Sequence, residues 1–207
     1  MTISSIPAMA PVSTSPWELP NKGLSVFYGR PETPRLFHYF LPRVILQGKQ
    51  VLCIDGGNRF DPLLIARFAR KRNLNSSEFG QNIRIARAFT CFQLTELLVR
   101  LPRLLKTFPA QLVIVTAFPD LYFDEDMRER EALTSFQRAL RALKGADRSS
   151  VPAAVFTDAT SFRSSRRVMF QDLIAQADQV FRFSVNEGTG LALTGEKFDP
   201  TILKALP

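Results

Sequence analysis

Short apolar runs alternate with longer segments of helical periodicity along most of this chain. Residues 24–28, 51–55 and 111–116 have the composition of buried strands, and the segments that follow them repeat apolar side chains at helical spacing. Parallel strands need a crossover of a dozen or more residues, which is usually a helix. The alternation therefore predicts an α/β fold, with a mainly parallel twisted sheet that carries helices on both faces.

The expected elements follow from composition and from start and stop signals. Asp61 and Pro62 have the types favoured at the N-cap and at the first position of a helix. We expect strands at residues 24–28, 51–55, 82–86, 111–116 and 153–157, helices at 36–47, 61–72, 91–106, 129–144 and 169–177, and a closing hairpin formed by 180–185 and 191–194.

The length of 207 residues favours one domain. Residues 1–20 contain four prolines among small polar residues, which indicates a flexible arm before a single domain at 21–207. Cys53 and Cys91 lie in apolar runs and are expected to be buried, reduced thiols. The first residues lack a signal-peptide pattern, and no apolar run approaches the roughly 20 residues that span a bilayer. We therefore expect a cytoplasmic protein without membrane partners.

The charge balance favours polyanionic partners. The chain has 27 Lys and Arg against 19 Asp and Glu, a net charge of +8. His38 is the only histidine, which excludes a site built from several histidines.

Residues 29–36 occupy the place of a phosphate-binding loop, between a strand and a helix. A working G-x-x-x-x-G-K-[ST] loop uses glycine N–H groups to hold phosphates, a Lys to reach them and a hydroxyl to hold magnesium. Only Gly29 fits this pattern. Pro34 takes the place of the second glycine and has no N–H, while Arg35 and Leu36 replace the Lys and the hydroxyl residue.

Three further segments, in this order, resemble the RecA/RadA recombinase family. Residues 51–62 (VLCIDGGNRFDP) resemble its second core strand and the following turn, residues 82–94 its third strand and an Arg-Ala pair before a helix, and residues 112–118 its Walker B strand. The resemblance covers residues 22–195. It implies a RecA-like P-loop NTPase core, with a mainly parallel sheet, helices on both faces and a C-terminal β-hairpin.

The same resemblance identifies the positions where the family's catalytic groups stand. The Lys and hydroxyl positions are Arg35 and Leu36, the position of the water-orienting Glu is Gly57, and that of the Walker B Asp is Thr116. Phosphoryl transfer depends on such positioning and charge-stabilising groups. The resemblance therefore implies a pseudo-ATPase with no catalytic residue, no metal site and no cofactor.

A degenerate nucleotide site, if retained, would involve Gly29, Arg30 and Arg35. Arg35 keeps a positive charge, which can hold a phosphate. This leaves open the alternative of a nucleotide-binding sensor, or of an ATPase with a noncanonical phosphate loop.

The segment after the fifth strand is the candidate DNA contact, because the resemblance implies that the loops after strands four and five face DNA. Phe162, Arg163, Arg166 and Arg167 offer guanidinium groups for phosphates and a ring for base stacking. A solvated loop is the competing interpretation. The loop at residues 120–131 is acidic instead, as is typical before a helix N-terminus.

These observations lead to one functional hypothesis and a rival. We expect a non-catalytic, RecA-like accessory protein of DNA recombination, repair and the SOS response. Its expected partners are DNA, including single-stranded DNA, and a RecA-type recombinase or a polymerase, with self-association left open. The rival is a regulatory interaction protein similar to the SulA-like cell-division inhibitors, with no nucleic-acid partner.

Overall fold

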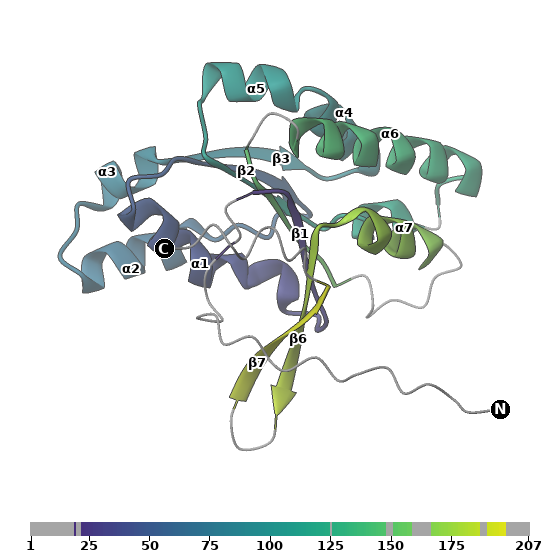
Figure 1. Cartoon of the computed structure of the whole chain (residues 1–207). Helices are drawn as coiled ribbons and strands as arrows, with labels where there is room; N and C mark the ends of the chain where they lie inside the picture. Colours follow the sequence, from purple (N-terminus) through teal and green to yellow (C-terminus); the bar gives the residue numbers. More distant parts are fainter. Residues whose placement is uncertain are drawn as a thin grey trace.

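The computed structural model describes residues 19, 22–124, 126–147, 151–158, 167–186 and 190–197. Its first strand, β1 (Leu24–Tyr28), lies inside the sheet and pairs in parallel with β5 (Ala153–Phe156) and β6 (Gln179–Asn186). The remaining strands are β2 (Val51–Gly56), β3 (Ile83–Ala88), β4 (Leu112–Thr116) and β7 (Gly190–Lys197). The order is β3-β2-β4-β5-β1-β6-β7. Among these described strands, only the β6–β7 pair is antiparallel, and Figure 1 shows the two strands side by side.

Helices cover both faces of the sheet (Figure 1). One face carries α1 (Phe37–Leu46), α2 (Pro62–Lys71) and α3 (Ser76–Gln81), and the other carries α4 (Cys91–Val99), α5 (Leu101–Thr107), α6 (Glu129–Asp147) and α7 (Val168–Gln176). Two 3-10 turns, η1 (Thr33–Arg35) and η2 (Asp120–Phe123), follow β1 and β4. The expected α/β architecture is confirmed.

Alternating side chains of the inner strands fill two separate cores. In β2, Leu52 and Ile54 pack beneath α4 and α6, while Val51 and Cys53 pack beneath α1 and α2. Every residue of β2 and β4 is buried, because helices cover both faces of a parallel sheet. Cys53 and Cys91 are both buried, as expected, and neither takes part in a disulfide.

The helix expected at residues 91–106 is two helices. The first ends at Val99, and Arg100 serves as its C-cap and as the N-cap of α5. Pro102 causes the break, because it lacks the N–H that would continue the ladder and its ring crowds the preceding turn. Leu94, Leu98 and Leu101 are nevertheless fully buried, so the predicted apolar stripe is retained across the break.

The short helix α3 was not expected. Asn75 begins it by accepting hydrogen bonds from the N–H groups of Ser77 and Glu78. Its six residues are too few for a periodic pattern. The predicted cap of α2 is confirmed, since the Asp61 side chain accepts from Leu63 N at 2.8 Å.

Most of the predicted arm, residues 1–18 and 20, lies outside the described residues. Leu19 is half-buried against the core beneath α1 and α2. In the part of the chain that the structure describes, no helix is long and apolar enough to cross a membrane.

Candidate functional site at the carboxyl edge of the sheet

The β1–α1 loop, residues 29–36, is bonded to itself. Arg30 N donates to Thr33 Oγ1 at 2.9 Å, and Thr33 N donates back to the Arg30 carbonyl at 2.9 Å. Arg35 N bonds the Glu32 carbonyl at 2.9 Å, and Leu36 N bonds the Thr33 carbonyl at 3.0 Å. Four N–H groups of the kind that a phosphate-binding loop directs at its ligand are thus used inside the loop.

Two prolines complete this arrangement. Pro31 and Pro34 have no N–H, and Pro34 lies in the η1 turn, buried together with Thr33. The Arg30 and Arg35 side chains are exposed, and Arg30 Nε lies 3.4 Å from a Glu32 oxygen. The structure therefore places the three predicted nucleotide residues in one loop, with the guanidinium groups at its surface.

Gly29 is required by the neighbouring strand. Its φ is +141°, and a Cβ added there would overlap the carbonyl oxygen of Phe183 in β6. Only glycine adopts such a φ without strain and lets two backbones approach this closely. Packing of β1 against β6 accounts for the one residue that fits the phosphate-loop pattern.

His38 joins the β1–α1 loop to the start of α2. Its Nδ1 lies 2.7 Å from the Arg35 carbonyl, and its Nε2 accepts from Asp61 N at 2.9 Å. These partners require a neutral ring with the proton on Nδ1. Burial lowers the pKa of His38, and this outweighs the Arg35 carbonyl, which favours the protonated ring. The single histidine is therefore a structural link between two helix starts.

Asp55, at the end of β2, organises the next turn. It is fully buried, and its carboxylate accepts from Arg59 N at 2.7 Å and from Phe60 N at 3.2 Å. The Thr116 hydroxyl donates to it at 3.2 Å, and Arg87 Nε lies 3.5 Å away. The family's strand-ending Asp is thus retained here as a bonded link between three strands.

Gly57 and Thr116, which stand at the positions of the family's water-orienting Glu and Walker B Asp, lie beside the Asp55 carboxylate. Gly57 has a φ of +68°, which suits glycine, and offers no functional group. Thr116 is fully buried, and its hydroxyl also donates to the Gly56 carbonyl at 3.0 Å. A Cβ on Gly56 would overlap the Thr116 carbonyl oxygen, so the two strand ends are in direct backbone contact.

A pair of acidic side chains lies at the ends of β4 and β5. The Thr157 hydroxyl donates to the Asp120 carboxyl group, and Asp158 N approaches the other Asp120 oxygen at 3.4 Å. Burial, followed by the nearby Asp158 charge, raises the pKa of Asp120 well above its ordinary value. One Asp158 oxygen is buried without a hydrogen-bond partner. Because β5 pairs in parallel with β1, this pair lies at the same edge of the sheet as the β1–α1 loop.

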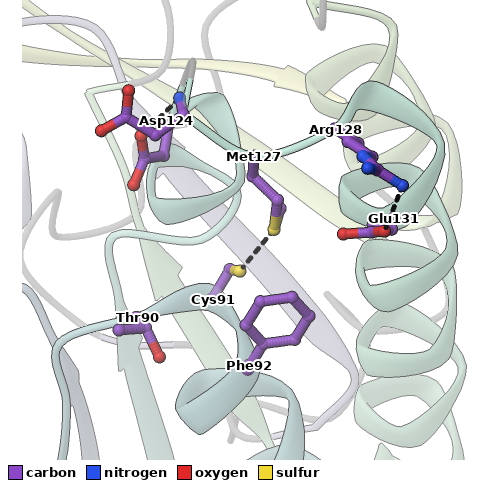
Figure 2. Close-up of a pocket in the computed structure, with 8 residues that line it drawn as sticks. Thr90, Cys91, Phe92, Asp124, Met127, Arg128 and Glu131 are labelled. Atoms are coloured by element: carbon purple, nitrogen blue, oxygen red, sulfur yellow. Dashed lines mark hydrogen bonds and ion pairs between the residues drawn. The ribbon is translucent and has the colours of Figure 1, made fainter.

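An acidic cavity of about 580 Å³ opens between the start of α4 and the start of α6. Figure 2 shows Phe92 beside the contact between Cys91 Sγ and Met127 Sδ, which lie 3.2 Å apart. Arg128 lies 3.9 Å from Glu131. The lining residues are Thr90, Cys91, Phe92, Asp124, Asp126, Met127, Arg128 and Glu131. Three carboxylates against one guanidinium make this cavity unsuitable for a DNA backbone.

Of the four residues predicted to contact DNA, one lies in the part of the chain that the structure describes. Arg167 is exposed and immediately precedes α7, whereas Phe162, Arg163 and Arg166 lie outside the described residues. No group of three or more His, Cys, Asp or Glu side chains suited to a metal occurs among residues that the structure describes.

A comparison with protein families supports the resemblance to the recombinases. The Rad51 family model matches residues 45–159, which is more than half of the chain. This chain belongs to the RecA/Rad51 recombinase family. It is accordingly a RecA-like protein related to recombination and repair. Among curated proteins, none matches the chain.

Two features of this RecA-like site were not expected from the sequence. The Asp120–Asp158 pair joins the ends of two strands that are far apart in the chain. An acid that follows an apolar strand, as in Phe-Thr-Asp at 156–158, is a signal that could have indicated one member of the pair. The partnership of Arg87 with Asp55 depends on the pairing of β2 with β3, and the sequence alone carries no signal for it.

Proposed function

We propose that this protein is a RecA-like accessory factor of DNA recombination and repair that does not hydrolyse nucleotide. In this proposal it binds DNA, including single strands, together with a recombinase or polymerase partner. The carrying observation is the internal bonding of the β1–α1 loop, where four backbone N–H groups donate to acceptors of the loop itself. Opening these bonds for a phosphate would cost the loop its own structure.

The side chains around the loop support the same proposal. Phosphoryl transfer needs a cation at the phosphates, a metal ligand and a group that orients water. The corresponding positions hold an exposed Arg35, a buried Leu36, and Gly57, which has no side chain. The hydroxyl of Thr116 is hydrogen-bonded to Asp55 and to the Gly56 carbonyl. Arg35 retains the positive charge of its family counterpart. The other three residues lack the functional group of theirs.

The distribution of charge supports a DNA contact away from the acidic cavity. A net charge of +8 attracts a polyanion, whereas Asp124, Asp126 and Glu131 repel one at the start of α6. The proposed contact is therefore the segment that ends at Arg167, with Phe162, Arg163 and Arg166 as its other members.

Fluorescence anisotropy with labelled single- and double-stranded DNA tests this proposal. We expect binding at low salt that weakens as salt rises. Replacing Arg163, Arg166 and Arg167 with Ala should lower the slope of log affinity against log salt by about 2, since each single-strand phosphate contact contributes roughly 0.7.

The matched control replaces three cations of α5, its N-cap Arg100 together with Arg103 and Lys106, with Ala. This variant should leave the slope of log affinity against log salt unchanged. A protein that binds neither form of DNA at low salt, and that does not associate with the recombinase of its host, would overturn the proposal. Equal slopes for the wild type and the variant with Ala at residues 163, 166 and 167 would mean that this segment does not contact DNA.

A further inference from the structure

The outer surface of α1 and α2 combines a groove with exposed apolar side chains. Both helices lie on the same face of the sheet (Figure 1). A cavity of about 350 Å³ lies between them, and its apolar lining consists of Tyr39, Pro42 and Leu46 from α1 and Phe68 from α2. Tyr39 is 66% exposed and Leu46 is 47% exposed, so the groove is open to a partner.

This groove has cations on both sides. Arg43 of α1 and Arg72 at the end of α2 line it, together with the ring of His38, which is neutral in its bonded state. Neither α1 (FHYFLPRVIL) nor α2 (PLLIARFARK) contains an acidic residue. The exposed residues of α2 include further cations and leucines: Leu63, Leu64, Arg67, Arg70 and Lys71.

We propose that the α1–α2 groove binds an acidic segment of a partner protein through an apolar side chain that enters the cavity. The charge is complementary, since the rim is cationic and both helices lack acids. The volume is at the lower end of ligand pockets and suits one or two apolar side chains of an extended segment. Leu46, which lines the groove, and Leu64, one turn before Phe68 on α2, would then be covered by the same segment.

A protein segment fits this surface better than a nucleic acid. Single-stranded bases bind by stacking on aromatic faces. The guanidinium of Arg72 already lies over the Phe68 ring, 5.1 Å from its centroid, and, apart from Tyr39, the large exposed apolar side chains of α1 and α2 are aliphatic. Aliphatic side chains gain by burial against other apolar groups and gain nothing from phosphates. The inference stands independently of DNA binding by the segment that ends at Arg167.

The experiment uses the full chain and a fluorescein-labelled peptide, Asp-Asp-Glu-Leu-Phe-Asp-Glu-Asp, measured by anisotropy. We expect saturable binding that weakens at least tenfold in Leu46→Asp and in Arg72→Glu. The matched controls, Leu133→Asp and Arg141→Glu on α6, should bind the peptide with the affinity of the wild type. All four variants should bind DNA with the affinity of the wild type. Circular dichroism checks that each variant is folded.

Two comparisons keep the inference falsifiable. A peptide with Ser in place of Leu and Phe should bind at least tenfold more weakly, because it lacks the anchor. An unlabelled oligo-dT strand should not displace the labelled peptide at physiological salt. Absence of peptide binding, equal affinity in the groove and control variants, or displacement by oligo-dT would each overturn the proposal, the last by assigning the groove to nucleic acid.

Discussion

Replacing Asp55 with Ala is expected to lower the free energy of unfolding by about 3–5 kcal/mol, the range for removing one partner from a buried ionic network. Its carboxylate is fully buried and holds the Arg59 and Phe60 N–H groups, the Thr116 hydroxyl and the Arg87 guanidinium. The substitution removes the acceptor of the two N–H groups and the partner of Arg87, while the Thr116 hydroxyl keeps the Gly56 carbonyl as an acceptor. For a domain of this size the loss corresponds to a decrease in melting temperature of about 6–20 °C, measured by calorimetry or circular dichroism.

Two variants separate the network from the loss of charge alone. Asp126→Ala removes an exposed carboxylate and should change stability by no more than about 0.5 kcal/mol. Arg87→Gln should cost less than Asp55→Ala, because the Arg87 side chain is 41% exposed and the hydrogen bonds to Asp55 remain. If Asp55→Ala melted within a degree of Asp126→Ala, Asp55 would not have the structural role described here.

Replacing Gly29 with Ala should also destabilise the fold strongly. The backbone at Gly29 has a φ of +141°, and a Cβ would overlap the Phe183 carbonyl oxygen. Backbone strain of this kind costs about 1–3 kcal/mol, and forcing β1 and β6 apart adds about 1–3 kcal/mol of overpacking. Urea denaturation at constant m-value measures the sum.

Gly48→Ala is the matched control. Gly48 has a φ of +75°, and a Cβ there would meet nothing within 4 Å, so this variant carries the strain without the overlap. We expect Gly29→Ala to be the less stable of the two by at least 1 kcal/mol, from the overpacking range above. Equal stabilities would mean that β6 does not require glycine at position 29, and the phosphate-loop explanation of this residue would return.

The features that the sequence predicted are those encoded locally or by periodicity. The apolar character of residues 111–116 indicated a strand buried on both faces, which is found at Leu112–Thr116, and Asp61 with Pro62 indicated the start of α2. Both signals act over a few residues, and tertiary packing reinforces them. The ordered series of segments then indicated the family that the comparison shows.

Some of the features that the sequence did not predict are local, and others depend on packing between distant segments. The helix break at Arg100 could have been inferred from Pro102, but the leucine stripe continued across it and suggested one helix. The self-bonding of the β1–α1 loop depends on the η1 turn at Pro34, and the Asp120–Asp158 pair depends on the pairing of β4 with β5. Local pattern can indicate an acid at the end of a strand, but it does not show which distant strand will pair with it.

Isothermal titration of the wild-type protein with ATP and magnesium tests the central claim most directly, namely that the β1–α1 loop serves the fold instead of a phosphate. The same titration is carried out on Arg35→Ala, which removes an exposed side chain and should leave the melting temperature unchanged. The account predicts no measurable heat of binding for either protein, since the loop N–H groups are already bonded within the loop. Tight, saturable binding by the wild type that is lost in Arg35→Ala would contradict it.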